Sequence, residues 1–214
     1  RNWPKSERLK KEKEALGFYV SGHPLDSYKS ESKLLATSIS KLKEGAHAEN
    51  NKVSLIGIVV NNIVRLNQNN EKFAISILED LRGTIEFPVF AKVYEKNGEL
   101  LESDKPLLIS GRVNYRDEKV GIFVENISLL SEIRENKAKS MTVKIGPEKL
   151  HEDDIILLRS TMQKFSGDKP FSFSIKTPES DIITINPEEK ISYSPELFEE
   201  LEELLPPQSF EFNY

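Results

Sequence analysis

The chain has 214 residues, no cysteine and a formal net charge of −5, which excludes disulfides, thiolate metal sites and cysteine nucleophiles. No apolar run approaches the roughly 20 residues that cross a bilayer as a helix, and the charged N-terminus is unlike a signal peptide. We therefore expect a cytoplasmic protein without a membrane partner. The charge falls from +3 over residues 1–50 to −2 over 51–133 and −6 over 134–214. Contact with nucleic acid must then be local, and the acidic last third favours a protein partner.

Residues 1–50 are predicted to form a helical segment followed by a connector. The helical spacing is carried by Leu9, Leu16 and Val20, with lysines and glutamates between them. Gly22 is placed to end this helix, and a shorter helix is expected after His23-Pro24 with Asp26 near its start. The polar stretch 37–51 is typical of a connector.

Residues 51–133 are predicted to form a five-stranded barrel. The strand signals lie at 53–64, 73–78, 84–89, 107–115 and 120–129. A helical stretch at 91–101 separates the third and fourth strands, and this order matches an OB barrel. Gly57 and Gly111 lie inside strands, where they suit a bulge or bend that lets a small barrel close.

Residues 141–214 are predicted to form a small α+β domain after a linker at 134–140. Strand and helix signals follow in the order βαββαβ, which predicts a small sheet with helices on one face. Ser194-Pro195 is a strong helix start. The whole chain is thus expected to be multidomain, with a helical segment, an OB barrel and this βαββαβ domain.

The first candidate for a catalytic group is His23. It could act as a base, with Asp26 as the carboxylate that orients it. Neither a nucleophile nor a metal-ligand set accompanies them, so we interpret His23 as a turn residue that bonds nearby backbone. The acidic groups at 152–154 and 199–203 are interpreted as a helix first turn and a solvated helix face. We therefore assign no catalytic residue, metal or cofactor to this chain.

The barrel offers a better site. Proteins bind single strands by stacking bases on aromatic side chains while cations follow the phosphates, and OB folds do so on strands two and three and in the loops joining strands one–two and four–five. The predicted nucleic-acid-binding residues are Arg65, Lys72, Arg112, Tyr115, Arg116 and Lys119. Phe73, Phe87 and Phe90 flank this face, and Phe73 and Phe87 are assigned to the core because they alternate with other apolar residues.

One stretch of the chain carries a family resemblance. Glu12–Tyr28 reads EKEALGFYVSGHPLDSY: a charged helix meets an apolar cluster, Ser-Gly ends it, and His-Pro restarts the chain. This stretch resembles the segment before the OB domain in the alpha subunit of bacterial DNA polymerase III. Shorter stretches at 78–83, 90–94 and 109–113 resemble the same family in the same order, so the resemblance covers almost the whole chain.

The resemblance implies that this chain is a non-catalytic, C-terminal part of a replicative DNA polymerase. A chain that starts at Arg1 and not at methionine is typical of an excised piece. The parent would be a DNA-directed DNA polymerase, a nucleotidyltransferase whose palm domain lies upstream. In the family, the OB domain contacts single-stranded template DNA and the C-terminal domain docks on the tau subunit of the clamp loader. The family's strand one–two loop maps onto Arg65 and Lys72, where asparagines replace the denser basic cluster of relatives.

A weaker resemblance lies at the end of the chain. Gln208, Phe210 and Phe212 are spaced like the pentapeptides that bind the sliding clamp, although the pattern fits the last strand of the small sheet better.

Two other functions stay open at the level of sequence. Phe87-Pro88 and the mixed C-terminal sheet are compatible with a tRNA-binding OB appendage of an aminoacyl-tRNA synthetase, although the residues after Ile133 are too few for a catalytic domain. The net charge of −2 over the barrel is also compatible with a scaffolding OB module that binds no nucleic acid.

Overall fold

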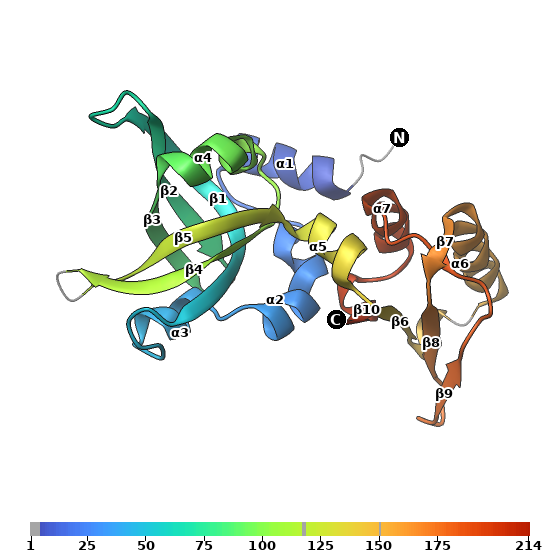
Figure 1. Ribbon diagram of the computed structural model, residues 1–214. Helices are drawn as coiled ribbons and strands as arrows, with labels where there is room; N and C mark the ends of the chain where they lie inside the picture. Colours follow the sequence, from blue (N-terminus) through green and yellow to red (C-terminus); the bar gives the residue numbers. More distant parts are fainter. Residues whose placement is uncertain (1–4, 117–118, 150) are drawn as a thin grey trace. The chain divides into compact units, whose positions relative to one another are not determined.

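The computed structural model describes residues 5–116, 119–149 and 151–214, and the chain forms two compact units (Figure 1). One unit is Glu31–Glu132, and the other joins Arg1–Ser30 to Ile133–Tyr214. The first contains a sheet of five strands and the second a sheet of four. The predicted fold class, a β unit combined with a smaller α+β unit, is therefore confirmed, while the predicted domain boundaries stay a prediction.

The five-stranded unit is a curled antiparallel sheet. Its strands are β1 (Lys52–Leu66), β2 (Lys72–Asp80), β3 (Gly83–Val89), β4 (Leu107–Arg116) and β5 (Lys119–Leu129). They are hydrogen-bonded in the order β3-β2-β1-β4-β5, and the two outer strands, β3 and β5, also contact each other. The sheet thus curls round on itself, and the arrangement is consistent with an OB-like fold.

Two glycines lie where the strand pairing changes. β1 pairs with β4 as far as Gly57 and with β2 from Ile58 onward, and the β4–β5 register shifts between Ser110 and Gly111. A Cβ atom on Gly111 would lie 2.1 Å from the carbonyl oxygen of Phe123, and one on Gly57 would lie 2.6 Å from that of Glu79. Only glycine permits these approaches, as the sequence predicted.

Short helices on either side of the strands complete this core. α4 (Ala91–Asn97) and η2 (Gly98–Glu102) lie between β3 and β4 in the chain. α4 contacts β2 and β5, and η2 contacts β1 and β5. α3 (Ile39–Lys43) lies in the stretch that we interpreted as a polar connector, and that interpretation is wrong, because Ile39 and Leu42 are fully buried in the barrel core. Asp80 fixes α3 by accepting a hydrogen bond from the Ile39 amide at 2.8 Å. Two apolar residues in a polar stretch are too few to produce a readable helical period.

The N-terminal helix α1 (Lys5–Leu16) is shorter than its apolar spacing predicted. It ends at Gly17, whose φ of +80° is the left-handed conformation of a helix C-terminus, so Gly17 takes the role expected of Gly22. Beyond it, the carboxylate of Glu12 accepts hydrogen bonds from the amides of Val20 and Ser21, each at 2.9 Å. Bonds donated by the side chain and amide of Ser21, and by the amide of Val20, lower the pKa of Glu12.

His23 has the structural role that the sequence favoured. Its Nδ1 accepts a hydrogen bond from the Leu25 amide at 3.1 Å, and Asp26 accepts one from the His23 amide at 2.7 Å. This reciprocal capping box starts the short helix η1 (Pro24–Tyr28), which leads into α2 (Lys29–Leu35).

The remaining elements belong to the C-terminal part of the chain. They are α5 (Leu130–Lys137), β6 (Ser140–Ile145), η3 (Pro147–Lys149), α6 (Glu152–Lys164), β7 (Ser166–Lys169), β8 (Phe171–Lys176), β9 (Ile182–Ile185), α7 (Pro195–Leu204), η4 (Pro207–Ser209) and β10 (Phe210–Asn213). The sheet order is β10-β6-β8-β9, with β6 and β8 parallel. The pattern matches βαββαβ except for the added short strand β7, and most of the predicted linker 134–140 lies in α5 and β6.

A buried arginine stands at the centre of this unit. The Arg134 side chain is 2% exposed, and its guanidinium lies over the rings of Tyr28, Phe212 and Phe198 at 4.1, 4.4 and 4.7 Å from the ring centroids. It also donates a hydrogen bond to the carbonyl of Ser27. A planar cation can stack on several rings at once, so Arg134 ties η1, α7 and β10 together.

The rest of the core is mostly apolar, and it includes the buried phenol of Tyr193. Leu197 and Leu201 of α7 are fully buried, with Ser194 as the predicted helix cap. Burial raises the pKa of Tyr193, and its hydroxyl donates to the carbonyl of Pro170. A phenol with its single proton held this way stays neutral in the core.

We expect Arg134→Lys to lower the free energy of unfolding by about 2–4 kcal/mol, because an ammonium keeps the buried charge but loses the planar stacking on three rings. Urea unfolding followed by circular dichroism measures the change. Lys137→Ala, on the exposed face of the same helix, is the control and should leave stability unchanged. A lysine variant as stable as the parent would contradict a stacking role.

We expect Gly111→Ala to lower the unfolding free energy of the five-stranded unit by about 1–3 kcal/mol, because the added methyl group meets the Phe123 carbonyl and overpacks the bend. Thermal denaturation followed by the far-UV circular dichroism of the β-sheet measures the loss of stability. The matched control is Gly83→Ala, where the nearest atom to the added carbon is 3.9 Å away. Equal stability of the two variants would show that the bend tolerates a side chain.

Candidate nucleic-acid interface

The two predicted cationic loops belong to the hairpins β1–β2 and β4–β5, which Figure 1 shows as projections of the five-stranded unit. In the first hairpin, Arg65 pairs across the strands with Phe73, and Leu66 pairs with Lys72. Neighbours in a strand point to opposite faces, so Arg65 and Lys72 lie on different faces of the ribbon. The structure therefore does not bring these two predicted residues together.

The face of β2 that packs inward is the reverse of the predicted one. Ala74, Ser76 and Leu78 are fully buried, whereas Phe73 is half-buried on the outer face beside Arg65. The assignment of Phe73 to the core was therefore wrong, and that of Phe87, which is fully buried, was correct. The sequence misleads here because both faces of β2 carry apolar residues, so alternation alone does not choose between them.

The second hairpin separates the predicted residues by face in the same way. Arg112 and Arg116 lie on the outer face of β4. Arg116 pairs with Lys119, the last pair of the ladder before the connection that joins β4 and β5. Tyr115 points to the opposite face, and its hydroxyl donates to the carbonyl of His47 at 2.7 Å. Tyr115 thus contacts the residues after α3 instead of sharing a face with Arg116 and Lys119. Residues 117 and 118 at the hairpin tip lie outside the described residues.

The aromatic group on the cationic face is Phe123, which the sequence analysis did not select. Phe123 pairs directly with Arg112 across β4 and β5, and it is 49% exposed while its neighbours Ile122 and Val124 are buried. The signal was present in the sequence, because Phe123 falls out of phase with these two β-branched core residues.

Phe123 has an aromatic partner, Phe90, on the same surface. The two ring centroids are 5.3 Å apart with a tilt of 30°, and Phe90 is 46% exposed. Phe90 stands at the start of α4, where its carbonyl accepts hydrogen bonds from Val93 and Tyr94, each at 2.9 Å. The helix start thus fixes the backbone of Phe90 beside β5. We call the Phe90–Phe123 pair, together with Arg112, Arg116 and Lys119, the aromatic–cationic face.

Arg112 on this face is held by two polar contacts. The Nε of Arg112 donates to Glu125 at 2.8 Å, and its Nη1 donates to the Asn50 carbonyl at 3.4 Å. Arg116 and Lys119 are exposed. The face therefore offers flat apolar rings with cations at one side, which suits a base stacked next to a phosphate.

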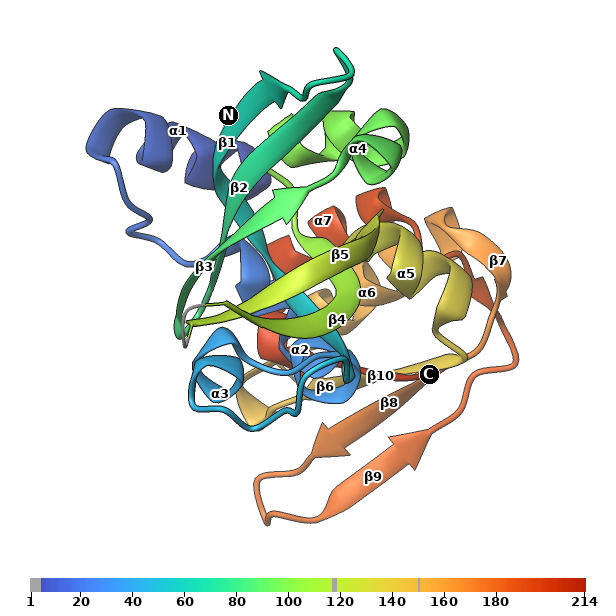
Figure 2. The same cartoon turned by 60° about the vertical axis from the view of Figure 1, so that its left-hand side comes forward.

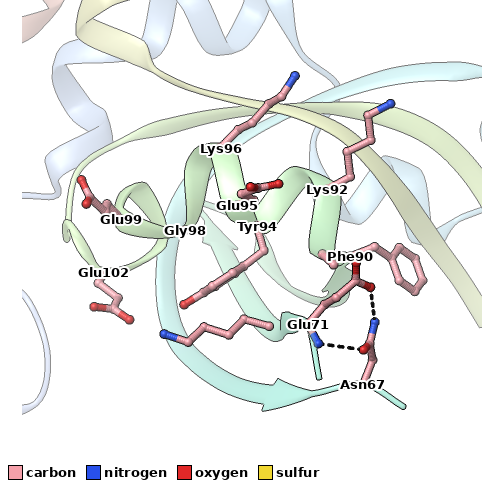
Figure 3. A pocket seen from close by; sticks show the side chains of 12 residues that line it. Asn67, Glu71, Phe90, Lys92, Tyr94, Glu95, Lys96, Gly98, Glu99 and Glu102 are labelled. Carbon is pink, nitrogen blue, oxygen red and sulfur yellow. Dashed lines mark hydrogen bonds between the residues drawn. The ribbon is translucent and has the colours of Figure 1, made fainter. Parts of the chain in front are cut away.

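A surface hollow lies on the other side of Phe90, between the β1–β2 hairpin and α4 (Figure 3). Lysines 72, 92 and 96 line it together with four glutamates, at 71, 95, 99 and 102. Figure 3 shows Glu99 and Glu102 across the hollow from Phe90. Four carboxylates against three ammonium groups give the hollow no net attraction for phosphates, so it is a poorer path for a nucleic-acid strand than the cations beside Phe123.

The two clamp-like phenylalanines at the chain's end pack in the core, whereas the glutamine is exposed. Phe210 and Phe212 lie in β10 and are buried in the core of the C-terminal sheet, where both contact the ring of Phe198. Gln208 is exposed in η4. Neither phenylalanine can reach a partner while β10 is paired with β6.

Comparisons with known proteins decide the family. The chain is 33% identical over 163 residues to DNA polymerase III subunit alpha of Borreliella burgdorferi, which covers 76% of this chain. It is 30% identical over 185 residues to the subunit of that name from Saccharopolyspora erythraea, covering 82% of the chain. The Vibrio cholerae subunit is 26% identical over 208 residues, covering 95%. The chain belongs to the DNA polymerase III alpha subunit family.

The match concerns one region of these long proteins. The chain spans 14% of the Borreliella subunit, 15% of the Saccharopolyspora subunit and 18% of the Vibrio subunit. No family model matches the chain. The relatives from Borreliella and Saccharopolyspora confirm the family resemblance that the motif Glu12–Tyr28 indicated.

Similarity to solved structures is slight. A hypothetical protein, ygiW from E. coli, has a TM-score of 0.34 at 21% identity and covers 44% of this chain. Asparaginyl-tRNA synthetase from Pyrococcus horikoshii has a TM-score of 0.36 at 14% identity and covers 69%. These scores are too low to bear on the fold or the function of this alpha-subunit region.

Two further features of the described residues bear on membranes and metals. Within residues 5–116, 119–149 and 151–214, no helix is long and apolar enough to cross a membrane. In the same ranges, no three histidine or acidic side chains are grouped to hold a metal ion.

Proposed function

We propose that this chain serves DNA replication as part of a polymerase alpha subunit, and that its five-stranded unit binds single-stranded DNA. Family membership supports the first part. The second part is carried by one observation, the exposed pair Phe90 and Phe123 lying next to Arg112. Exposed aromatic pairs are costly to leave in water, and bases stack on such rings whatever their sequence.

The strand's path follows from the arrangement of charge. Arg112 is the direct cross-strand neighbour of Phe123, and Arg116 and Lys119 follow along the same face toward the hairpin tip. We propose that a base stacks on the Phe90–Phe123 pair while the phosphates on either side lie against these cations. Arg65 beside Phe73 extends the same chemistry on the outer face of the β1–β2 hairpin.

The binding we propose is weak and dependent on salt. The chain as a whole carries a charge of −5, and one of the cations, Arg112, is already paired with Glu125. Each phosphate contact on a single strand contributes a slope of about 0.7 in the logarithmic dependence of affinity on salt. Few contacts therefore give low affinity, with stacking as the main term.

We expect Phe123→Ala to weaken binding of a fluorescent oligo-dT by about 5- to 150-fold, because one stacked base contributes about 1–3 kcal/mol. Phe90→Ala should have a similar effect. Fluorescence anisotropy at two salt concentrations measures both affinity and salt slope. Because the rings are half exposed, both variants should fold, which a thermal melt checks.

The matched control for this measurement is Phe18→Ala, a phenylalanine that is 60% exposed in the other unit, and its affinity should equal that of the parent. Arg116→Ala with Lys119→Ala should reduce the salt slope by about 1.4. Unchanged affinity in Phe123→Ala would refute this face as the DNA site. Absence of binding even at low salt would favour a scaffolding role instead.

The tRNA-binding alternative is not favoured, because the relatives that cover most of the chain are polymerase subunits.

We also propose that the C-terminal unit docks on the tau subunit of the clamp loader. The supporting observation is a set of three successive exposed apolar residues on α6, Ile155, Ile156 and Leu157, which leaves more than one side of this helix apolar and uncovered. Exposed apolar patches mark protein-binding surfaces, and the acidic charge of this part of the chain disfavours nucleic acid. The sliding clamp is not proposed as a partner through residues 208–212, because their phenylalanines are buried.

We expect Ile156→Lys to weaken binding of the cognate tau subunit by about tenfold or more, because a charge would be placed in an apolar contact. Surface plasmon resonance with immobilised tau measures the affinity. Leu34→Lys is the matched control, since both side chains are 58% exposed. Equal tau affinity of the two variants would place the contact elsewhere.

A further inference from the structure

The outer strand of the C-terminal sheet, β9, has an open edge. β9 is the last strand in the order β10-β6-β8-β9, and it is paired on one side only, with β8. Figures 1 and 2 both show it at the margin of its sheet. All four of its residues are exposed, so the backbone groups on its free side are accessible to another strand.

The side chains of β9 are apolar, which is unusual for such an edge. Three of its four residues are isoleucine, and they are 70%, 51% and 46% exposed at 182, 183 and 185. Natural edge strands are commonly protected by charged residues, proline or a bulge. β9 contains no charged residue, no proline and no bulge. Of the features that protect an edge strand, it has only its short length.

The apolar face of the sheet extends beyond the strands that the unit's own core covers, onto β9. Ile183 pairs with Ile175, and Ile185 pairs with Phe173, so these four side chains share one face. Burial on this face decreases outward, from Met141 and Val143 of β6, which are fully buried, through Phe173 and Ile175, which are partly buried against the core, to the exposed isoleucines of β9. One more strand with apolar residues on this face would continue the core over Ile183 and Ile185.

The charges that flank β9 indicate which strand would fit. Glu179 and Asp181 precede it, and Glu188 and Glu189 follow it, all exposed, while the nearest cations are Lys176 and Lys190. The surroundings are net acidic. A second copy of β9 would bring the same acidic groups together, which is unfavourable. A strand flanked by lysine or arginine is complementary.

We propose that β9 is a docking edge for an extended segment of another protein, with alternating β-branched residues flanked by basic ones. The segment adds to the sheet as a fifth strand next to β9. Backbone hydrogen bonds give the affinity, and the side chains on one face, lying against Ile183 and Ile185, give the specificity. This inference does not depend on the tau proposal, whose surface lies on α6.

The test uses the ¹⁵N-labelled chain and the synthetic peptide Lys-Val-Thr-Val-Thr-Val-Lys, titrated by NMR at low salt. The expected result is a set of saturable shifts in the amides of residues 182–185. The matched peptide Glu-Val-Thr-Val-Thr-Val-Glu should bind about fivefold or more weakly, because its charges are repelled by the acidic flanks. A peptide with proline at its central position should not bind, since it cannot complete the ladder.

A pair of variants isolates the apolar face. Ile183→Lys should weaken the basic peptide about tenfold, the effect of about 1.4 kcal/mol in binding free energy. Ile182→Lys adds the same charge but points to the opposite face of the strand, so its effect should be much smaller. Both residues are exposed, and the unshifted remainder of the spectrum shows that each variant folds.

Four outcomes would overturn the proposal. The first is the absence of shifts in β9 with the basic peptide, and the second is equal binding of the basic and acidic peptides. The third is loss of β9 signals with rising chain concentration and no peptide present, which would make a second copy the occupant. An equal effect of Ile183→Lys and Ile182→Lys would likewise exclude a face-specific contact.

Discussion

The guanidinium of Arg134, buried among three aromatic rings, is the interaction on which one of the two units is built. A charge this well buried costs several kcal/mol in lost hydration, and the contacts with Tyr28, Phe198 and Phe212 offset that cost. The rings come from η1 near the start of the chain and from α7 and β10 near its end. The hydrogen bond to the Ser27 carbonyl then fixes the end of the His23-Pro24 motif, so the most distinctive stretch of sequence is explained by packing and capping rather than by catalysis.

In the five-stranded unit, the close approach of backbones at Gly111 has a similar organising role. The carbonyl of Phe123 occupies the space that a side chain at 111 would need, and this tight ladder holds the ring of Phe123 on the outer face. The start of α4 supplies Phe90 to the same place. Closing the barrel and presenting a stacking surface are therefore two results of one local geometry. A function in binding unpaired DNA would need only the strands of the curled sheet and the start of α4.

The two units differ in the chemistry they expose. The five-stranded unit presents aromatic rings beside cations, together with exposed aliphatic residues of β1 such as Ile63 and Leu66, whereas the C-terminal unit presents aliphatic side chains on α6 and β9 in acidic surroundings. Aromatic rings with cations suit polynucleotides, and aliphatic patches suit proteins. This division of surface chemistry agrees with a region of a polymerase subunit that contacts both template and accessory proteins, as we propose.

The sequence by itself determined the family, the existence of most strands and helices, and the capping role of His23, because motifs, alternation and cap residues are local properties. It did not determine which face of a strand packs inward when both faces are apolar, as at Phe73, nor that Tyr115 and Arg116 diverge while Phe123 joins the cations. It also missed the core residues Ile39 and Leu42, and the buried role of Arg134. Those features arise from strand register and from contacts between residues far apart in the chain, and only the tertiary structure fixes them.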